Sequence, residues 1–163
     1  MNKLPEFTEE KKAQVKSDLK FCGFLLICAA ATVILFKTVF FTGYIPSQSM
    51  VPTLNVGDVI FGERITPRRK NGIQDGDIVI FKKENKYLIK RVFAKGGERV
   101  DVIGDGHVKK SKDGQKVPKN HYYMLGDNAN NSYDSRYWDN PYVAQKNIIA
   151  KYHFKIPFGN LRK

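Results

Sequence analysis

An apolar run near the N-terminus is the feature that most restricts how this chain can fold. The segment from Phe21 to Phe36 contains no charged residue, and after Lys37 the run resumes up to Phe41. At about 1.5 Å per helical residue, residues 21–41 roughly match the ~30 Å hydrocarbon core of a lipid bilayer. The run is apolar on every side, unlike the single apolar stripe of a helix on a soluble domain. We therefore predict one transmembrane helix over residues 21–41.

A cleaved secretory signal is the alternative interpretation of this run. Ala29 and Ala31 resemble the small-residue pattern of a cleavage site. However, the apolar run continues well past Ala31, and a strong motif begins directly after it, so we favour an uncleaved anchor. The short lysine-rich segment 1–20 predicts a cytoplasmic N-terminus. Residues 42–163 are then expected outside the cytoplasm, as a single-pass protein of the cell membrane.

Alternation between polar and apolar residues is common in residues 42–163. This pattern is typical of half-buried β-strands. Turn signals such as Asn71-Gly72 and Asp75-Gly76 separate the segments, and no stretch after the anchor shows a sustained helical period. The segments with this pattern are Asp58–Ile65, Asp77–Lys82, Tyr87–Phe93, His121–Leu125 and Asn147–Phe154. The sequence therefore predicts a mainly β protein, in which one transmembrane helix precedes an all-β domain of short strands.

The excess of basic residues suggests an anionic partner. The chain has 28 Lys and Arg against 16 Asp and Glu, a formal net charge of +12. Nucleic acid or an anionic membrane surface would suit this charge. The sequence has no zinc pattern, RNA-binding aromatic strand or recognition helix, so we expect the lipid bilayer and no nucleic acid. The basic segment 109–119 is predicted to be a solvated hairpin or loop.

Three segments contain residues suited to chemistry: 46–54 (PSQSMVPTL), 87–92 (YLIKRV) and 126–136 (GDNANNSYDSR). A serine hydroxyl is a weak nucleophile unless a base lies beside it. None of the three histidines lies in a recognisable triad motif; they are His107, His121 and His153. We also find no metal-ligand spacing and no phosphate-binding glycine loop, so no metal and no cofactor are expected.

A lysine can replace histidine as the base if it is neutral. Desolvation disfavours the ammonium form, so burial among apolar side chains prepares a lysine for this role. In a strand, Leu88, Lys90 and Val92 share one face, which places apolar neighbours on both sides of the Lys90 amine. Lys90 is therefore the candidate base.

Taken together and in this order, the anchor and the three segments resemble the type I signal peptidases. These are membrane-anchored serine endopeptidases that use a Ser/Lys dyad. The resemblance covers nearly the whole chain and includes Gly-Asp-Ile-Val-Ile-Phe at 76–81. In length the chain is similar to the compact Gram-positive forms of the family.

The resemblance implies roles for individual residues. Ser49 matches the nucleophile and Lys90 the general base. The Ser47 hydroxyl and the Ser49 N–H would form the oxyanion hole, and Ser132 matches the serine that orients the lysine amine. Ion pairs that support the site are expected at Asp127, Asp134 and Arg136.

The resemblance also implies the substrate, which is the signal peptide of an exported preprotein. Such peptides carry small residues at positions −1 and −3 relative to the cleaved bond. The substrate would lie extended along residues 43–49 and along the strand that contains Lys90. The residues expected to line its pockets are Ile45, Pro46, Met50, Leu54, Leu88 and Ile89.

Two positions depart from the family pattern. Ala129 stands where the family usually has arginine, which puts one supporting ion pair in question, and residues 94–98 replace a common Gly-Leu-Pro-Gly-Asp turn. A second hypothesis is therefore a catalytically silent relative that acts as a membrane-bound assembly factor for surface proteins. Because Ser49 and Lys90 are both present, we favour the enzyme. The sequence leaves open the oligomeric state, and whether the substrate set is general or dedicated.

Overall fold

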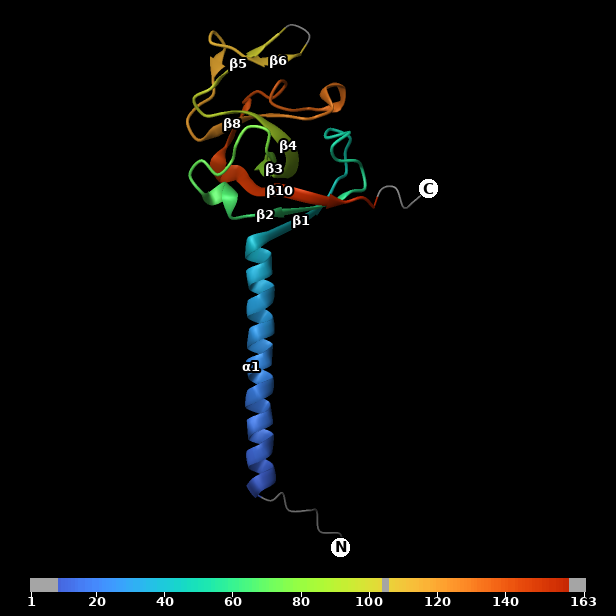
Figure 1. Ribbon diagram of the computed structural model, residues 1–163, viewed down its shortest axis with the longest axis vertical. Coiled ribbons are helices and arrows are strands. Elements are labelled where there is room, and N and C mark those ends of the chain that lie inside the picture. The colour runs from blue at the N-terminus through green and yellow to red at the C-terminus, as the bar shows by residue number, and fades with distance from the viewer. Residues whose placement is uncertain (1–8, 104–105, 159–163) are drawn as a thin grey trace. The chain divides into compact units, whose positions relative to one another are not determined.

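The computed structural model describes residues 9–103 and 106–158. The chain divides into two compact units, Met1–Thr38 and Val39–Lys163. In its described part the first unit is a single helix, α1 (Glu9–Val39), and the second contains the β-strands and the short 3-10 helices (Figure 1).

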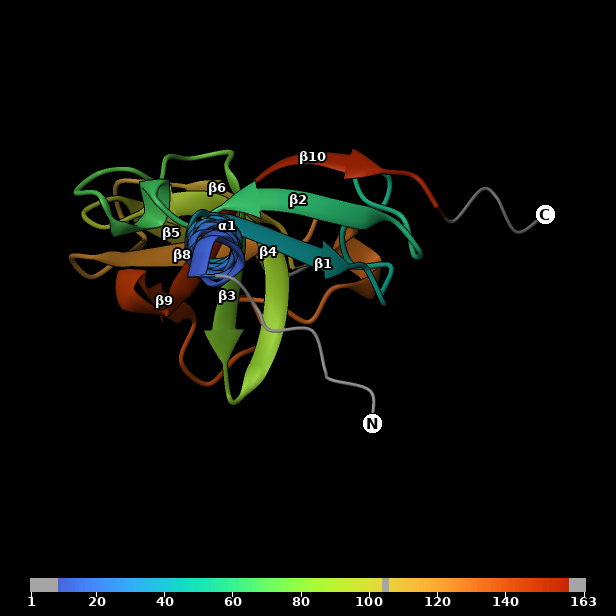
Figure 2. The same ribbon diagram turned by 90° about the horizontal axis from the view of Figure 1, so that it is seen from below.

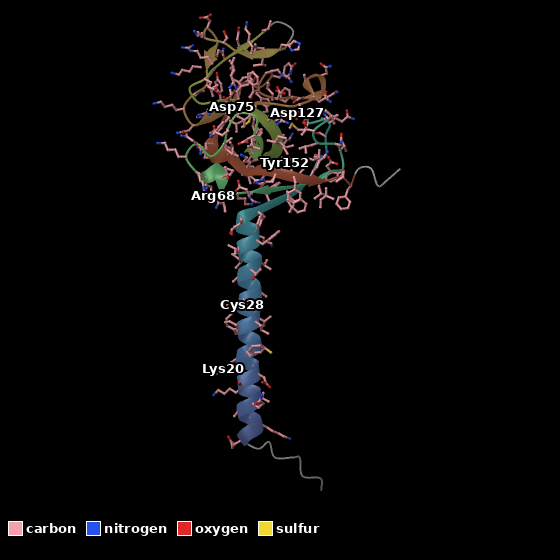
Figure 3. The ribbon with its side chains drawn as sticks, viewed as in Figure 1. Lys20, Cys28, Arg68, Asp75, Asp127 and Tyr152 are labelled. Carbon is pink, nitrogen blue, oxygen red and sulfur yellow. The ribbon has the colours of Figure 1, made fainter. Side chains whose placement is uncertain are left out.

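Helix α1 is long and apolar enough over Lys11–Val39 to cross a membrane, a test that a signal sequence would also pass. Most of its described side chains are exposed, including that of Cys28, which is labelled in Figure 3. The helix begins before the predicted segment 21–41, since the polar turns that precede it are also helical. It ends at Val39, because the last two residues of that segment, Phe40 and Phe41, begin a strand instead. The bounds of a membrane-spanning part stay a prediction.

Seven antiparallel strands form the main sheet in the order β1-β2-β10-β3-β4-β8-β9. Their bounds are β1 Phe40–Tyr44, β2 Val59–Glu63, β3 Ile78–Lys83, β4 Lys86–Lys95, β8 His121–Leu125, β9 Tyr142–Ala144 and β10 Ile148–Ile156. Strand β2 lies beside β10, and β3 beside β4 (Figure 2). The predicted mainly β fold is confirmed.

A smaller sheet has the order β6-β5-β7. It consists of β5 (Arg99–Val102), β6 (Val108–Lys110) and β7 (Gln115–Lys116). Part of the segment predicted to be a solvated hairpin or loop is therefore strand. Val117, at the end of that segment, is fully buried in a cluster with Val100, which ties the segment to the domain.

Strand β3 lies at the centre of the main sheet and separates two apolar clusters. Val79 and Phe81 pack into one cluster, whereas Ile78 and Ile80 pack into the other. This follows from the alternation of side chains along a strand. Lys90 of β4 is the cross-strand partner of Val79, so its side chain lies on the face of the first cluster.

Candidate active site

The segment that contains Ser49 is fixed by apolar anchors. Ile45, Met50 and Leu54 are buried in the cluster that also holds Ile80. These side chains fix the backbone on both sides of Ser49, because each would lose favourable burial if the segment moved. Ser49 itself is only 6% exposed. The buried apolar residues on either side of Ser49 therefore hold this serine in one position.

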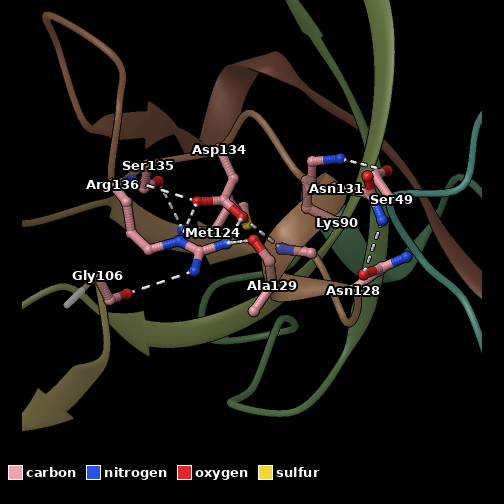
Figure 4. Close-up of polar contacts among 11 residues, drawn as sticks. Ser49, Lys90, Gly106, Met124, Asn128, Ala129, Asn131, Asp134, Ser135 and Arg136 are labelled. Carbon is pink, nitrogen blue, oxygen red and sulfur yellow. Dashed lines mark hydrogen bonds and ion pairs between the residues drawn. The ribbon is translucent and has the colours of Figure 1, made fainter.

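The Lys90 amine lies beside the Ser49 hydroxyl. Lys90 Nζ is 2.5 Å from Ser49 Oγ, and the lysine is only 4% exposed (Figure 4). Burial lowers the pKa of Lys90 below the ordinary lysine value of 10.5, although the charges of Asp134 and Asp127 oppose the shift. A neutral amine beside a hydroxyl is the arrangement that general-base catalysis by lysine requires.

Ser47 and the Ser49 backbone complete the neighbourhood of the hydroxyl. Ser47 Oγ lies 3.5 Å from Ser49 Oγ. The Ser49 carbonyl accepts a hydrogen bond of 3.1 Å from the N–H of Asn128, and the Asn128 side chain donates to the Gln48 carbonyl at 3.2 Å. Asn128 therefore joins segment 126–136 to the serine segment. Asn128 lies within one of the three motif segments, but the sequence alone predicts no role for it.

Ser132 is buried close to the Ser49 carbonyl, which accepts the hydrogen bond from Asn128. The residue is 6% exposed, and within residues 9–103 and 106–158 its hydroxyl makes no hydrogen bond to Lys90, although it helps to lower the pKa of Asp134. The expected hydrogen bond to the Lys90 amine is therefore not formed. A Cβ on Gly126 would overlap both the Ser132 side chain and the Ser49 carbonyl oxygen, so these groups approach each other across a glycine backbone. The structure brings Ser132 to the site without bonding it to Lys90.

Asp134 and Arg136 form a buried ion pair within segment 126–136. Arg136 Nε and Nη2 each lie 2.8 Å from an Asp134 carboxylate oxygen, and the side chain of Arg136 is 7% exposed and that of Asp134 0%. Burial alone would raise the pKa of Asp134, but hydrogen bonds from Arg136 and from the Gly126 N–H outweigh it and lower the pKa. Arg136 also donates to the Ala129 carbonyl at 3.1 Å. The pair therefore fixes the path of the segment.

Asp127 is paired with Arg91, which sequence reasoning did not include among the site residues. Arg91 Nε and Nη2 lie 2.8 and 2.6 Å from the two carboxylate oxygens, and Arg91 also contacts Thr53 Oγ1 at 3.4 Å. Although burial opposes it, the Arg91 guanidinium lowers the pKa of Asp127. Asp127 therefore has an arginine partner, Arg91, even though Ala129 stands where the family usually has arginine. The one feature of the sequence that could have pointed to Arg91 is its position directly after Lys90.

A family model described as "Signal peptidase, peptidase S26" matches residues 19–109 and 102–156. The chain belongs to this signal peptidase family.

Several named relatives are similar to this family member. A signal peptidase I of Leptolyngbya laminosa is 38% identical over 138 residues, which cover 66% of this chain and 64% of the relative. A signal peptidase I of Bacillus amyloliquefaciens is 26% identical over 182 residues, covering 96% of this chain and 98% of the relative. An "Inactive signal peptidase IA" of Staphylococcus aureus strain N315 is 29% identical over 159 residues, with 82% and 90% covered. At 64%, the match to the Leptolyngbya relative spans less than two thirds of that protein.

The residues predicted to line substrate pockets differ in exposure in this signal peptidase family member. Met50 and Leu54 are fully buried and present no surface to a ligand. Ile45 is also buried, whereas Leu88 and Ile89 are half-buried and Pro46 is exposed. Only the last three could touch a substrate without movement of the chain.

Strand β4 has a one-sided edge beside the site. Residues 86–91 of β4 pair with β3, but its pairing with β8 begins only at Arg91. Among the described residues, the stretch Lys86–Lys90 therefore has no strand on its second side. Backbone groups on such an edge are available to an added strand.

Metal ligands do not gather in the described part of the chain. It contains no group of three or more His, Cys, Asp or Glu side chains that could hold a metal ion. Cys22 and Cys28 are both free and exposed on α1.

Proposed function

We propose that this protein is a membrane-anchored serine endopeptidase that removes N-terminal signal peptides from exported preproteins. The observation that carries the proposal is the 2.5 Å contact between Lys90 Nζ and Ser49 Oγ, in which both side chains are buried. Membership of the signal peptidase family supports the same reaction class. Ser49 is the nucleophile, and Lys90 is the general base.

The reaction proceeds through an acyl-enzyme. The neutral Lys90 amine takes the Ser49 proton while Oγ bonds to the carbonyl carbon of the scissile peptide. The tetrahedral intermediate then collapses, the C–N bond breaks, and Lys90 returns the proton to the leaving nitrogen. In the second half, a water molecule gives a proton to Lys90 and attacks the acyl carbon, and Ser49 leaves with that proton.

The developing oxyanion needs hydrogen-bond donors. The Ser49 N–H and the Ser47 hydroxyl are the donors assigned to it, and Ser47 Oγ lies 3.5 Å from the nucleophilic oxygen. One such donor is worth roughly 3 kcal/mol in acyl-transfer enzymes. The Asn128 side chain donates to the Gln48 carbonyl at 3.2 Å, and this carbonyl belongs to the same peptide unit as the Ser49 N–H, so the bond helps to fix the direction of that N–H. Ser132 is the residue assigned to orient the Lys90 amine.

The signal peptide binds as an added strand. The open edge of β4 at Lys86–Lys90 supplies backbone hydrogen bonds, and Pro46, Leu88 and Ile89 supply apolar contacts. Backbone pairing gives affinity in this mode, whereas small pockets give specificity. Shallow pockets suit the small residues expected at −1 and −3.

The membrane holds the enzyme near its substrate. Residues 21–41 of α1 and β1 are assigned to the anchor, residues 1–20 to the cytoplasm, and residues 42–163 to the outer side. The length and composition of α1 support this assignment. A membrane-inserted signal peptide then presents its cleavage point on the side where the β domain lies.

A catalytically silent assembly factor is the second candidate function. A relative that is named inactive shows that such forms exist in the family. The retained pair of Ser49 and Lys90 favours the enzyme.

A cleavage assay with the full chain in detergent micelles separates the two candidates. Wild-type protein should convert a preprotein to its mature form. Ser49→Ala and Lys90→Ala should each lose at least about 10³-fold in rate, as expected when one member of a catalytic unit is removed. Lys82→Ala, which removes an exposed lysine on the neighbouring strand β3, is the matched control and should keep full activity. Cleavage by either dyad variant at more than a tenth of the wild-type rate would refute the assignment.

A further inference from the structure

Five basic side chains line one groove away from the candidate active site. The groove has a volume of about 1020 Å³, and its basic residues are Arg64, Arg68, Lys70, Lys119 and Lys146. It lies between two 3-10 helices, η1 (Thr66–Arg68) and η3 (Gln145–Asn147), and the first residues of β8 and β10. Arg68 is labelled in Figure 3. We call this feature the basic groove.

The positive charges of the basic groove are not neutralised within the described part of the chain. No acidic residue lines the groove, and none of its five basic side chains forms an ion pair there. Some basic residues elsewhere are paired with a carboxylate, as Lys151 is with Asp77 and Lys155 with Asp58. An uncompensated cluster of this kind attracts anions.

The nearest carboxylate along the chain is engaged in backbone contacts. Glu63 directly precedes Arg64, but its Oε2 accepts hydrogen bonds from the Ile65 and Thr66 N–H groups at 2.6 and 2.9 Å. Its other oxygen lies 4.0 Å from His153. Glu63 therefore shapes the turn that leads into η1 and is not a lining residue of the groove.

The walls of the basic groove are tied together by the protein itself. Gln145 Nε2 donates to the Pro67 carbonyl at 3.1 Å and to the Arg69 carbonyl at 3.0 Å. The Gln145 N–H donates to the Asn120 carbonyl at 2.8 Å, which joins η3 to the segment before β8. Because these bonds fix the walls in the empty protein, a ligand would not have to order them.

One end of the groove is fixed to the point where α1 ends. The Arg64 N–H donates to the Val39 carbonyl at 2.8 Å, and Arg64 Nε donates to the Phe40 carbonyl at 3.0 Å. Val39 is the last residue of α1. If α1 crosses a membrane, chain connectivity alone therefore holds Arg64 at the boundary where lipid headgroups lie.

We propose that the basic groove binds the phosphate headgroup of an anionic phospholipid. The proposal rests on the membrane anchoring in the proposed function and is independent of the Ser/Lys dyad. Two arginines and three lysines line one groove, and guanidinium and ammonium groups suit a phosphate group. Since Arg64 is bonded to the backbone of Val39 and Phe40, a lipid at the end of the proposed anchor meets this residue at a higher effective concentration than a soluble anion does.

Native mass spectrometry of the full chain tests the proposal directly. The protein is released from neutral detergent micelles after titration with phosphatidylglycerol or, in parallel, phosphatidylcholine. Wild-type protein should bind phosphatidylglycerol about tenfold or more tightly than phosphatidylcholine. The triple variant Arg68→Ala/Lys70→Ala/Lys146→Ala should lose that preference. The triple variant Lys82→Ala/Lys112→Ala/Lys116→Ala removes the same charge from exposed lysines outside the groove and should keep the preference.

Three results would overturn the proposal. An equal loss in both triple variants would mean that net charge alone attracts the lipid. Displacement of phosphatidylglycerol by equimolar inorganic phosphate would identify a site for a free anion, and displacement by a glutamate decapeptide would identify a site for an acidic polypeptide. Circular dichroism melting of each variant verifies that it is folded, and the single variant Lys146→Glu repeats the test with one exposed residue. If the lipid preference is absent but the protein still cleaves a preprotein, the lipid-binding proposal fails and the proposed peptidase function is unaffected.

Discussion

The Lys90 amine lies 2.5 Å from the Ser49 hydroxyl, although the two residues are 41 positions apart in the chain. Lys90 is held by its place in β4, between β3 and the point where β8 begins to pair. Ser49 is held by the buried side chains of Met50 and Leu54 and by the hydrogen bond from Asn128. Two independent parts of the domain therefore determine the contact.

The pH dependence of cleavage should report the state of Lys90. A protonated amine cannot accept the Ser49 proton, so kcat/KM should rise with pH as Lys90 becomes neutral. Because burial lowers the pKa of Lys90, the rise should be complete below the ordinary value of 10.5. The measurement is a pH–rate profile of the wild type, with Lys82→Ala as the control. A rise that occurs only near the pKa of a free lysine would contradict the assignment.

The stability of the protein should also depend on Lys90. Its pKa is lower in the folded than in the unfolded state, so the unfolded chain binds more protons between the two values. The free energy of unfolding should therefore rise with pH through that window. Lys90→Met removes the cost of burying an amine and should raise Tm at pH 6. That advantage should shrink as the pH approaches 10.5, and differential scanning fluorimetry across this range measures it.

Breaking the pair of Asp134 and Arg136 should destabilise the domain strongly. Both side chains are almost fully buried, so Asp134→Asn leaves an uncompensated guanidinium at a cost of about 3–5 kcal/mol. The pKa of Asp134 is lowered in the fold, so its contribution is present above its ordinary value of 3.8 and is lost as the pH falls through the folded value. Urea unfolding at pH 7 measures the loss.

The double variant Asp134→Asn/Arg136→Gln serves as the control for this loss. It should recover part of the stability, because no buried charge remains unpaired. A cost of the single variant below about 1 kcal/mol would show that the pair is solvated.

Gly126→Ala should disturb the serine segment. The new methyl group would overlap the Ser132 side chain and the Ser49 carbonyl oxygen, and overpacking of this kind costs about 1–3 kcal/mol. Displacement of the Ser49 backbone should lower kcat more than it raises KM. Gly23→Ala, where a Cβ meets nothing within 4 Å, is the matched control and should leave both constants unchanged. Equal kinetics for the two variants would show that the loop moves freely.

Ser132→Ala separates a role in catalysis from a role in folding. The buried Ser132 hydroxyl makes no hydrogen bond to Lys90 but helps to lower the pKa of the Asp134 carboxylate, so its removal should lower the free energy of unfolding by only about 1 kcal/mol or less. If Ser132 orients the Lys90 amine during the reaction, kcat should fall by about tenfold to a hundredfold, less than for the dyad variants. Chemical denaturation and kcat are measured on the same samples. A loss of stability without loss of kcat would make Ser132 a structural residue only.

The long strands could be predicted from the sequence because alternation is visible over several residues. Residues 58–65, 77–82, 87–93, 121–125 and 147–154 overlap β2, β3, β4, β8 and β10. The strands β5, β6, β7 and β9 have two to four residues each, too few to show a period. Phe40 and Phe41 were predicted to continue the helix, but they belong to β1 and pair with β2.

Sequence reasoning found residues of the candidate site where a motif named them, and missed partners that depend on folding. The resemblance pairs Ser49 with Lys90, and the two side chains lie in contact in the fold, while their catalytic roles stay a prediction. Arg91 was missed because its partner Asp127 lies on another segment, and a surface arginine has the same local sequence signal. Asn128 was missed because it acts through a backbone contact that only the fold creates.

The open edge of β4 has a consequence for which sequences can be cut. A polypeptide that pairs with Lys86–Lys90 must adopt the pleat of that strand, so its alternate side chains point to the same face. Two positions that are separated by one residue then meet the protein surface together, and the residue between them faces away. A preference for small residues at −1 and −3, with no restriction at −2, would therefore follow from the pairing of the substrate with β4.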